Sequence, residues 1–92
     1  MTRPEAEALA LEALIWLSGR EEDLQRLLAE SGLGPDDVRR RARDPEFLGF
    51  VMEALLSDEA LTRAFAAAVG APPDAPLRAR AALPGGDAPF WT

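Results

Sequence analysis

Residues 44–70, DPEFLGFVMEALLSDEALTRAFAAAVG, predict two helices that meet at a tight corner at Ser57-Asp58. Apolar side chains cover more than half the circumference of the first helix, and such a helix must be wrapped by several neighbours. We therefore expect it at the centre of the core. In the second helix we expect Ser57 as the N-cap and Gly70 as the end. Its expected buried stripe is Leu61, Ala64, Phe65, Ala68 and Val69.

The length and composition indicate a single all-α domain. A chain of 92 residues is long enough for one small hydrophobic core. Alanine and leucine dominate, and both are strong helix formers. We expect a compact single-domain helical bundle of about five helices over residues 1–83, followed by an irregular C-terminal tail over residues 84–92.

The residue types that are missing argue against an enzyme. The chain contains no cysteine, histidine, tyrosine or lysine. It therefore lacks the usual near-neutral general base, the imidazole and thiolate metal ligands and the Schiff-base amine. Its acidic clusters lie where helices begin, and none has the spacing of a calcium loop. We predict no catalytic residue, no metal site and no cofactor.

The N-terminal helix has apolar residues on two faces. Thr2 and Glu5 form a capping box at its start, and Gly19 is expected to end it in the left-handed conformation. Leu11 and Ile15 project away from the core-facing side. Either the C-terminal segment covers them, which we favour, or they form a dimer or partner interface. The expected core face is Ala6, Leu9, Ala10, Ala13, Leu14 and Leu17.

The C-terminal region combines a short helix with an aromatic end. Over residues 75–83 we expect an inward face of Leu77, Ala81 and Leu83, and an outward face of Arg78 and Arg80. Phe90 and Trp91 are costly to leave in water. The favoured interpretation is that they dock over Leu11 and Ile15; the alternative is an exposed motif for a partner protein.

A helix-turn-helix pattern across residues 24–43 is the one hint of nucleic-acid binding. Gly32 lies in the turn, and the residues that would face a groove are Arg39, Arg40, Arg41 and Arg43. Asp36 and Asp37 at the start of the second helix would oppose phosphates, and the net charge is −6. The sequence therefore favours a tight helical corner with solvated arginines over a nucleic-acid partner.

The chain shows no membrane or export signal. Glu5, Glu7 and Glu12 interrupt the first apolar run, unlike a signal peptide, and no stretch is apolar for about 20 residues. We expect a cytoplasmic protein.

Three segments, ALALEALIWLSG, LLAESGLGPDDVRRRARDPEFLGFVMEALLSDEAL and RARAALPGGDAPFWT, together carry a family resemblance over nearly the whole chain. The chain resembles a small alphaproteobacterial family, domain of unknown function three-five-seven-two. The resemblance implies a bacterial cytoplasmic origin and a complete chain, and it assigns no activity, cofactor or site residue.

From the residues themselves we predict a non-catalytic interaction or adaptor module. It would bind a protein partner, or a second copy of itself, through an apolar groove that involves Leu11, Ile15, Phe90 and Trp91. The alternative is weak nucleic-acid binding through the arginine patch at Arg39–Arg43.

Overall fold

The computed structural model describes residues 1–84 and contains six helices and no strand within that range, which confirms the all-α prediction. None of these helices combines the length and hydrophobicity that a membrane crossing requires. The helices are α1 (Arg3–Ser18), α2 (Glu21–Ser31), α3 (Pro35–Arg41), α4 (Pro45–Leu56), α5 (Glu59–Val69) and α6 (Ala75–Ala82).

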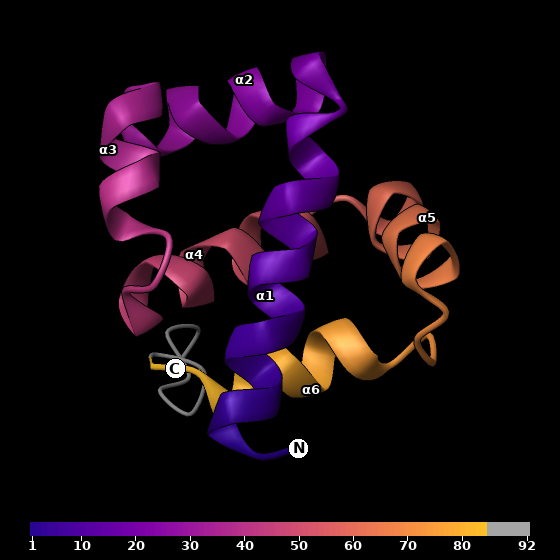
Figure 1. Ribbon diagram of the computed structural model, residues 1–92. Helices are drawn as coiled ribbons and strands as arrows, with labels where there is room; N and C mark the ends of the chain where they lie inside the picture. Colours follow the sequence, from indigo (N-terminus) through magenta and orange to yellow (C-terminus); the bar gives the residue numbers. More distant parts are fainter. Residues whose placement is uncertain (85–92) are drawn as a thin grey trace, which may run out of the picture.

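The first helix runs through the middle of the molecule. It packs most extensively against α6 and α4, and less against α2 and α5. Figure 1 shows α2 leaving the end of α1, and α3 returning on the same side as the start of α4. Helix α5 lies at the opposite edge. The centre of the fold is therefore shared by α1 and α4.

Small residues on α1 and α6 allow the helices to approach closely. Ala6, Ala10 and Ala13 of α1 and Ala79 of α6 are fully buried. Larger side chains of α4 and α5 fill the remaining space. The most deeply buried of these are Val51, Met52, Leu55 and Phe65.

The helix ends follow the sequence signals with two exceptions. Thr2 and Glu5 form the predicted capping box, and Gly70 ends α5 in the left-handed region at φ 68°. Asp58, rather than Ser57, is the N-cap of α5, and its side chain accepts a hydrogen bond from the Leu61 backbone N–H. Gly19 has φ −90°, so the prediction of a left-handed stop there is wrong.

The predicted face of α6 is wrong. Leu77 is 63% exposed and Ala81 is exposed, whereas Ala75, Pro76 and Ala79 are buried. Packing of the small residues against α1 sets the rotation of this short helix, and it turns Leu77 outward. Leu83 is buried as predicted, but Arg80 is turned inward.

The predicted stripe of α5 is partly wrong. Leu61 and Phe65 are buried and Val69 is half-buried, as expected. Ala64 and Ala68 are exposed, and Ala66 is buried in their place. Helix α5 lies at the edge of the fold, so only a narrow stripe of it meets other helices.

Candidate functional site

Two pockets lie between one face of α1 and one face of α3, and together we call them the α1–α3 groove. One wall is a single face of α3 and its end, with lining residues at the helical spacing i, i+3, i+4, i+7 and i+8. These are Pro35, Val38, Arg39, Ala42 and Arg43. The other wall is one face of α1, made by Pro4, Glu7, Ala8, Leu11, Leu14 and Ser18.

Neighbouring helices close the two ends of the groove. Leu24 and Leu28 of α2 complete one pocket of about 250 Å³. Leu48 of α4 completes the second pocket, of about 370 Å³. The α2 end has only Ser18 and Arg39 as polar lining residues, whereas Glu7 and Arg43 line the α4 end. The lining is therefore mainly apolar at the α2 end and mixed at the α4 end.

Local turn chemistry places α3 apart from α1. Gly32 ends α2 with φ 71°, and the Gly34 N–H donates to the Asp37 carboxylate at 3.0 Å. No residue of this seven-residue helix is fully buried. Val38 and Ala42 pack only partly against the core, as predicted, and space remains between them and α1.

The arginines on the rim differ in their charge partners. Arg39 lies 3.7 Å from Asp36, and Arg40 pairs with Asp37. Arg43 is exposed and has no ion pair within residues 1–84. Arg43 is thus available for a carboxylate that comes from outside the described part of the chain.

Two of the predicted interaction residues lie at this groove. Leu11 is half-buried in its lining. Ile15 is 63% exposed. Positions 8, 11, 15 and 18 share one helical face, so Ile15 projects beside the lining residues of α1. Phe90 and Trp91 lie outside the described residues.

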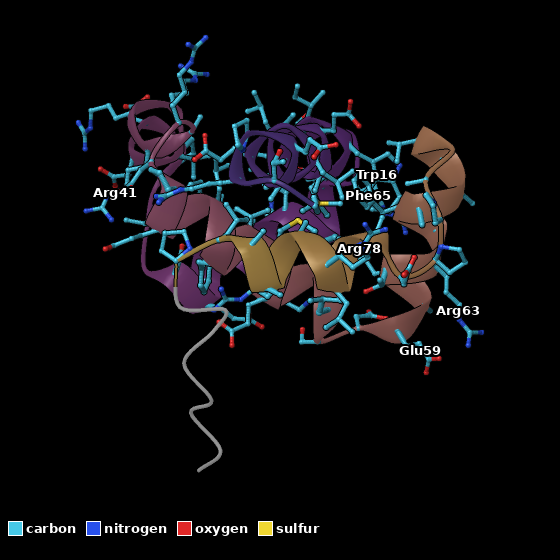
Figure 2. All side chains as sticks on the ribbon, turned by 90° about the horizontal axis from the view of Figure 1, so that it is seen from below. Trp16, Arg41, Glu59, Arg63, Phe65 and Arg78 are labelled. Carbon is cyan, nitrogen blue, oxygen red and sulfur yellow. The ribbon has the colours of Figure 1, made fainter. Side chains whose placement is uncertain are left out.

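The four predicted arginines have different surroundings. Arg39 and Arg43 line the groove, while Arg41 lines a separate pocket of about 260 Å³ with Glu30 and Glu46. Arg40 is exposed beside Asp37. Figure 2 shows Arg41 at one edge of the molecule, opposite the edge that carries Glu59 and Arg63.

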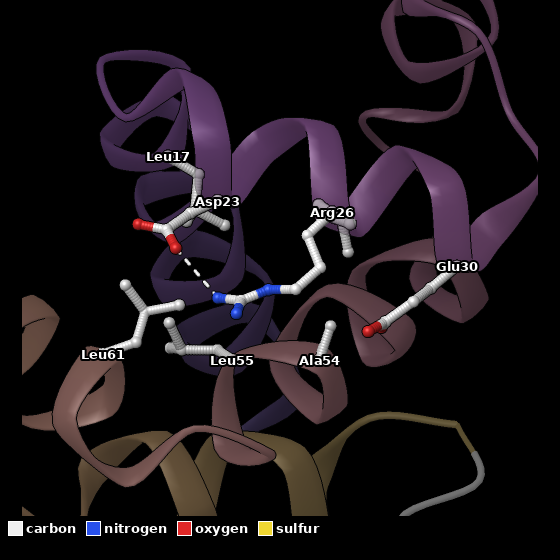
Figure 3. A pocket seen from close by; sticks show the side chains of 8 residues that line it. Leu17, Asp23, Arg26, Glu30, Ala54, Leu55 and Leu61 are labelled. Carbon is white, nitrogen blue, oxygen red and sulfur yellow. Dashed lines mark hydrogen bonds and ion pairs between the residues drawn. The ribbon is translucent and has the colours of Figure 1, made fainter.

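A further cavity lies under α2 but is too small for a ligand. It has a volume of about 10 Å³, which is about the space one water molecule needs. Figure 3 shows Asp23 and Arg26 paired across its mouth, at 2.8 Å. Arg26 also lies 3.5 Å from Asp58. These contacts connect α2 to the start of α5 and explain the charged residues without a binding role.

No reactive constellation is found within residues 1–84. No three metal-ligating side chains come together in this range, and every buried side-chain polar atom in it has a hydrogen-bond partner. Glu5 is the one described group with a resolved pKa shift. The backbone N–H of Thr2, and second its side chain, hold the pKa of the Glu5 carboxyl below its usual value. That shift belongs to the helix cap and not to a site.

The sequence patterns did not identify most of the groove lining. Pro35, Val38 and Ala42 are separated by three and four residues, which is a signal for one helix face. That spacing does not say how far the face lies from α1, because the distance between α1 and α3 is a tertiary property. The position of Leu28 at the end of the groove is likewise set by packing.

Comparison with known proteins adds a family. No curated protein and no solved structure matches the chain significantly. A family model matches residues 3–86, a range that includes all six helices and both walls of the groove. The chain therefore belongs to the family described as protein of unknown function (DUF3572).

Proposed function

We propose that the protein is a non-catalytic interaction module that binds a segment of a partner protein in the α1–α3 groove. The partner segment carries bulky apolar side chains and at least one carboxylate. The observation that carries this proposal is the groove itself, with two pockets between facing sides of α1 and α3 and with Ile15, 63% exposed, on the same face of α1.

The apolar part of the groove supports binding of large aliphatic or aromatic side chains. Burial of apolar surface stabilises a complex by about 25 cal/mol for each Å² before the cost of ordering both partners. Leu14, Leu24, Leu28 and Val38 offer such surface at the α2 end. Ile15 adds an exposed aliphatic side chain at the edge.

The charges on the rim support a carboxylate in the partner. Arg39 lines the pocket at the α2 end, and Arg43, one helical turn away, lines the pocket at the α4 end. The chain has a net charge of −6, so the long-range field does not attract an acidic partner. The two arginines would instead act at short range and set the register and orientation of the bound segment.

The chemistry of the lining supports a role in binding rather than in catalysis. Its polar side chains are Glu7, Ser18, Arg39 and Arg43. The Ser18 hydroxyl donates to the Ile15 carbonyl of its own helix. A serine nucleophile needs an adjacent base, and the chain has neither histidine nor lysine to provide one.

The test is a peptide-display selection against the full chain, followed by affinity measurements on a matched pair of variants. Ile15→Glu and Leu77→Glu each place a carboxylate at an aliphatic position that is 63% exposed. Only Ile15 lies beside the groove. We expect selected peptides to contain aromatic or leucine residues and an acid, and to bind the wild type and Leu77→Glu alike. Binding to Ile15→Glu should weaken about tenfold or more, a loss of about 1.4 kcal/mol.

Equal binding to both variants would contradict the proposal. A second arm titrates duplex DNA and RNA at low salt. Tight, steeply salt-dependent binding that is lost in the double variant Arg40→Glu, Arg41→Glu would replace the proposal with nucleic-acid binding.

A further inference from the structure

We infer that residues 85–92 of the same chain occupy the α1–α3 groove until a partner displaces them. Asp87 would face Arg43 at the α4 end, and Phe90 and Trp91 would fill the apolar α2 end. This inference rests on the proposed function, because it treats the groove as a binding site. It adds that the chain carries its own competing ligand.

The place where the described chain ends is the first argument. Arg80 donates hydrogen bonds to the Glu53 carboxylate at 3.2 Å and to the Pro84 carbonyl at 3.0 Å. The Pro84 carbonyl also lies against Gly49, where an added Cβ would be only 3.0 Å away. Leu48, which closes the α4 end of the groove, is the next residue along the helix. Figure 1 shows α6 running toward the side where α3 and the start of α4 lie.

The reach of the segment is the second argument. An extended chain spans about 3.3 Å for each residue, so Asp87 reaches about 10 Å from Pro84 and Trp91 about 23 Å. The α1 wall from Pro4 to Ser18 is about 21 Å long at 1.5 Å for each residue. A nearly extended segment is therefore about as long as the α1 wall, with Asp87 near its start and Trp91 near its end.

The order of residue types is the third argument. Asp87 comes first from the exit point, and the end of the groove nearest that point carries Arg43, which has no ion pair among the described residues. Phe90 and Trp91 come later, and the far end is lined by Leu14, Leu24, Leu28 and Val38. Charge and hydrophobicity thus match in the same direction along the groove.

Residues 85–92 are covalently joined to the helical domain, so they can fill the groove even if their intrinsic affinity for it is low. A ligand joined by a few residues has an effective concentration of about millimolar, so weak contacts suffice to keep it bound. A partner segment with the same chemistry must compete with it. The partner's apparent affinity is therefore reduced in proportion to the fraction of molecules whose groove is free.

The test uses the absence of cysteine. Thr92→Cys creates a single site for a nitroxide spin label on the full chain. Paramagnetic broadening of amide signals in NMR then reports which residues lie near the label. We expect broadening along residues 11–18 and 35–43, and none for the exposed face of α5 at Ala64 and Ala68. Phe90→Ala combined with Trp91→Ala should remove the broadening while circular dichroism remains helical.

Two further measurements complete the test. Arg43→Glu, at an exposed position, should reduce the broadening, whereas Arg78→Glu on α6 should not. Peptides selected for the groove should bind about tenfold tighter to the Phe90→Ala, Trp91→Ala chain than to the wild type.

The outcomes separate this inference from the proposed function. No broadening in the groove would overturn the inference, while peptide binding that depends on Ile15 would leave the proposed function standing. Broadening in the groove without any peptide binding, even to the Phe90→Ala, Trp91→Ala chain, would support the inference and contradict the proposed function. A mixture of spin-labelled chains and isotope-labelled chains without a spin label tests for a second copy. Broadening of the signals of the isotope-labelled chains would show that the segment comes from another molecule, and it would overturn docking within one chain.

Discussion

The guanidinium of Arg80 lies 3.2 Å from the carboxylate of Glu53 and joins α6 to α4. The Arg80 side chain is only 15% exposed, and its second nitrogen donates to the Pro84 carbonyl. A half-buried arginine between two helices differs from the exposed pairs within single helices elsewhere on this protein, such as Arg63 with Glu59.

Replacement of Arg80 should therefore destabilise the fold more than replacement of Arg63. For Arg80→Met we expect the free energy of unfolding to fall by about 1.5–3 kcal/mol, because the part-buried hydrogen bond to the Pro84 carbonyl and the pairing with Glu53 are both lost. For Arg63→Met we expect a loss of about 0.3–0.5 kcal/mol, as for other exposed pairs one helical turn apart. Urea denaturation followed by circular dichroism measures both losses. Equal losses would contradict the larger stabilising role given to Arg80.

Enlargement of a buried alanine should be costly on α1 and harmless on α5. Ala10 is fully buried where α1 meets its neighbours, whereas Ala64 is exposed. We expect Ala10→Leu to lower the free energy of unfolding by about 1–3 kcal/mol through overpacking. Ala64→Leu should change it by less than about 0.5 kcal/mol, which thermal unfolding of both variants can check.

The glycines at two helix ends should respond differently to alanine. Gly70 has φ 68°, a left-handed conformation that costs an L-residue about 1–2 kcal/mol. Gly19 has φ −90°, which any residue adopts. Gly70→Ala should thus lower the melting temperature by several degrees, since 1 kcal/mol corresponds to about 4–8 °C in a domain of this size. Gly19→Ala should leave it nearly unchanged, and a comparable fall there would contradict the observed backbone.

The cap of α1 should make stability depend on pH. The Thr2 N–H donates to Glu5 at 2.9 Å, and the pKa of the Glu5 carboxyl is lowered in the folded protein. A lowered folded-state pKa stabilises the fold above the ordinary glutamate pKa of 4.5, and this contribution is lost as the pH falls through the folded-state pKa. Glu5→Gln keeps a hydrogen-bond acceptor without the charge. Melting curves should show a wild-type advantage at pH 7 that shrinks as the pH falls below 4.5. A difference that stays constant with pH would contradict a contribution from the charge of Glu5.

Local signals predicted the helices well because they depend on neighbouring residues alone. Thr2 with Glu5 marked the start of α1, and Asp44 before Pro45 marked the start of α4. The same signals failed where adjacent residues compete. Ser57 and Asp58 are both good caps, and the chain geometry at the corner selects Asp58 while Ser57 donates to the Ala54 carbonyl.

Faces of short helices could not be predicted because their rotation depends on packing. Leu77 is the largest aliphatic residue of α6, yet small Ala79 faces α1 and Leu77 faces solvent. An eight-residue helix has only about two turns, so its hydrophobic periodicity is a weak signal. A few contacts with neighbouring helices then decide which face of the helix is buried.

The amino-acid sequence alone determined the all-α class, the family, the start of nearly every helix and the apolar second face of α1 with Leu11 and Ile15. Those properties follow from side-chain composition, capping and periodicity within one segment. Only the tertiary structure decided that α3 stands apart from α1, that Arg39 and Arg43 share a groove while Arg41 does not, and that Pro84 leaves the core beside Gly49. These relations depend on how far apart separately folded helices settle when their side chains pack, and no single segment encodes that distance.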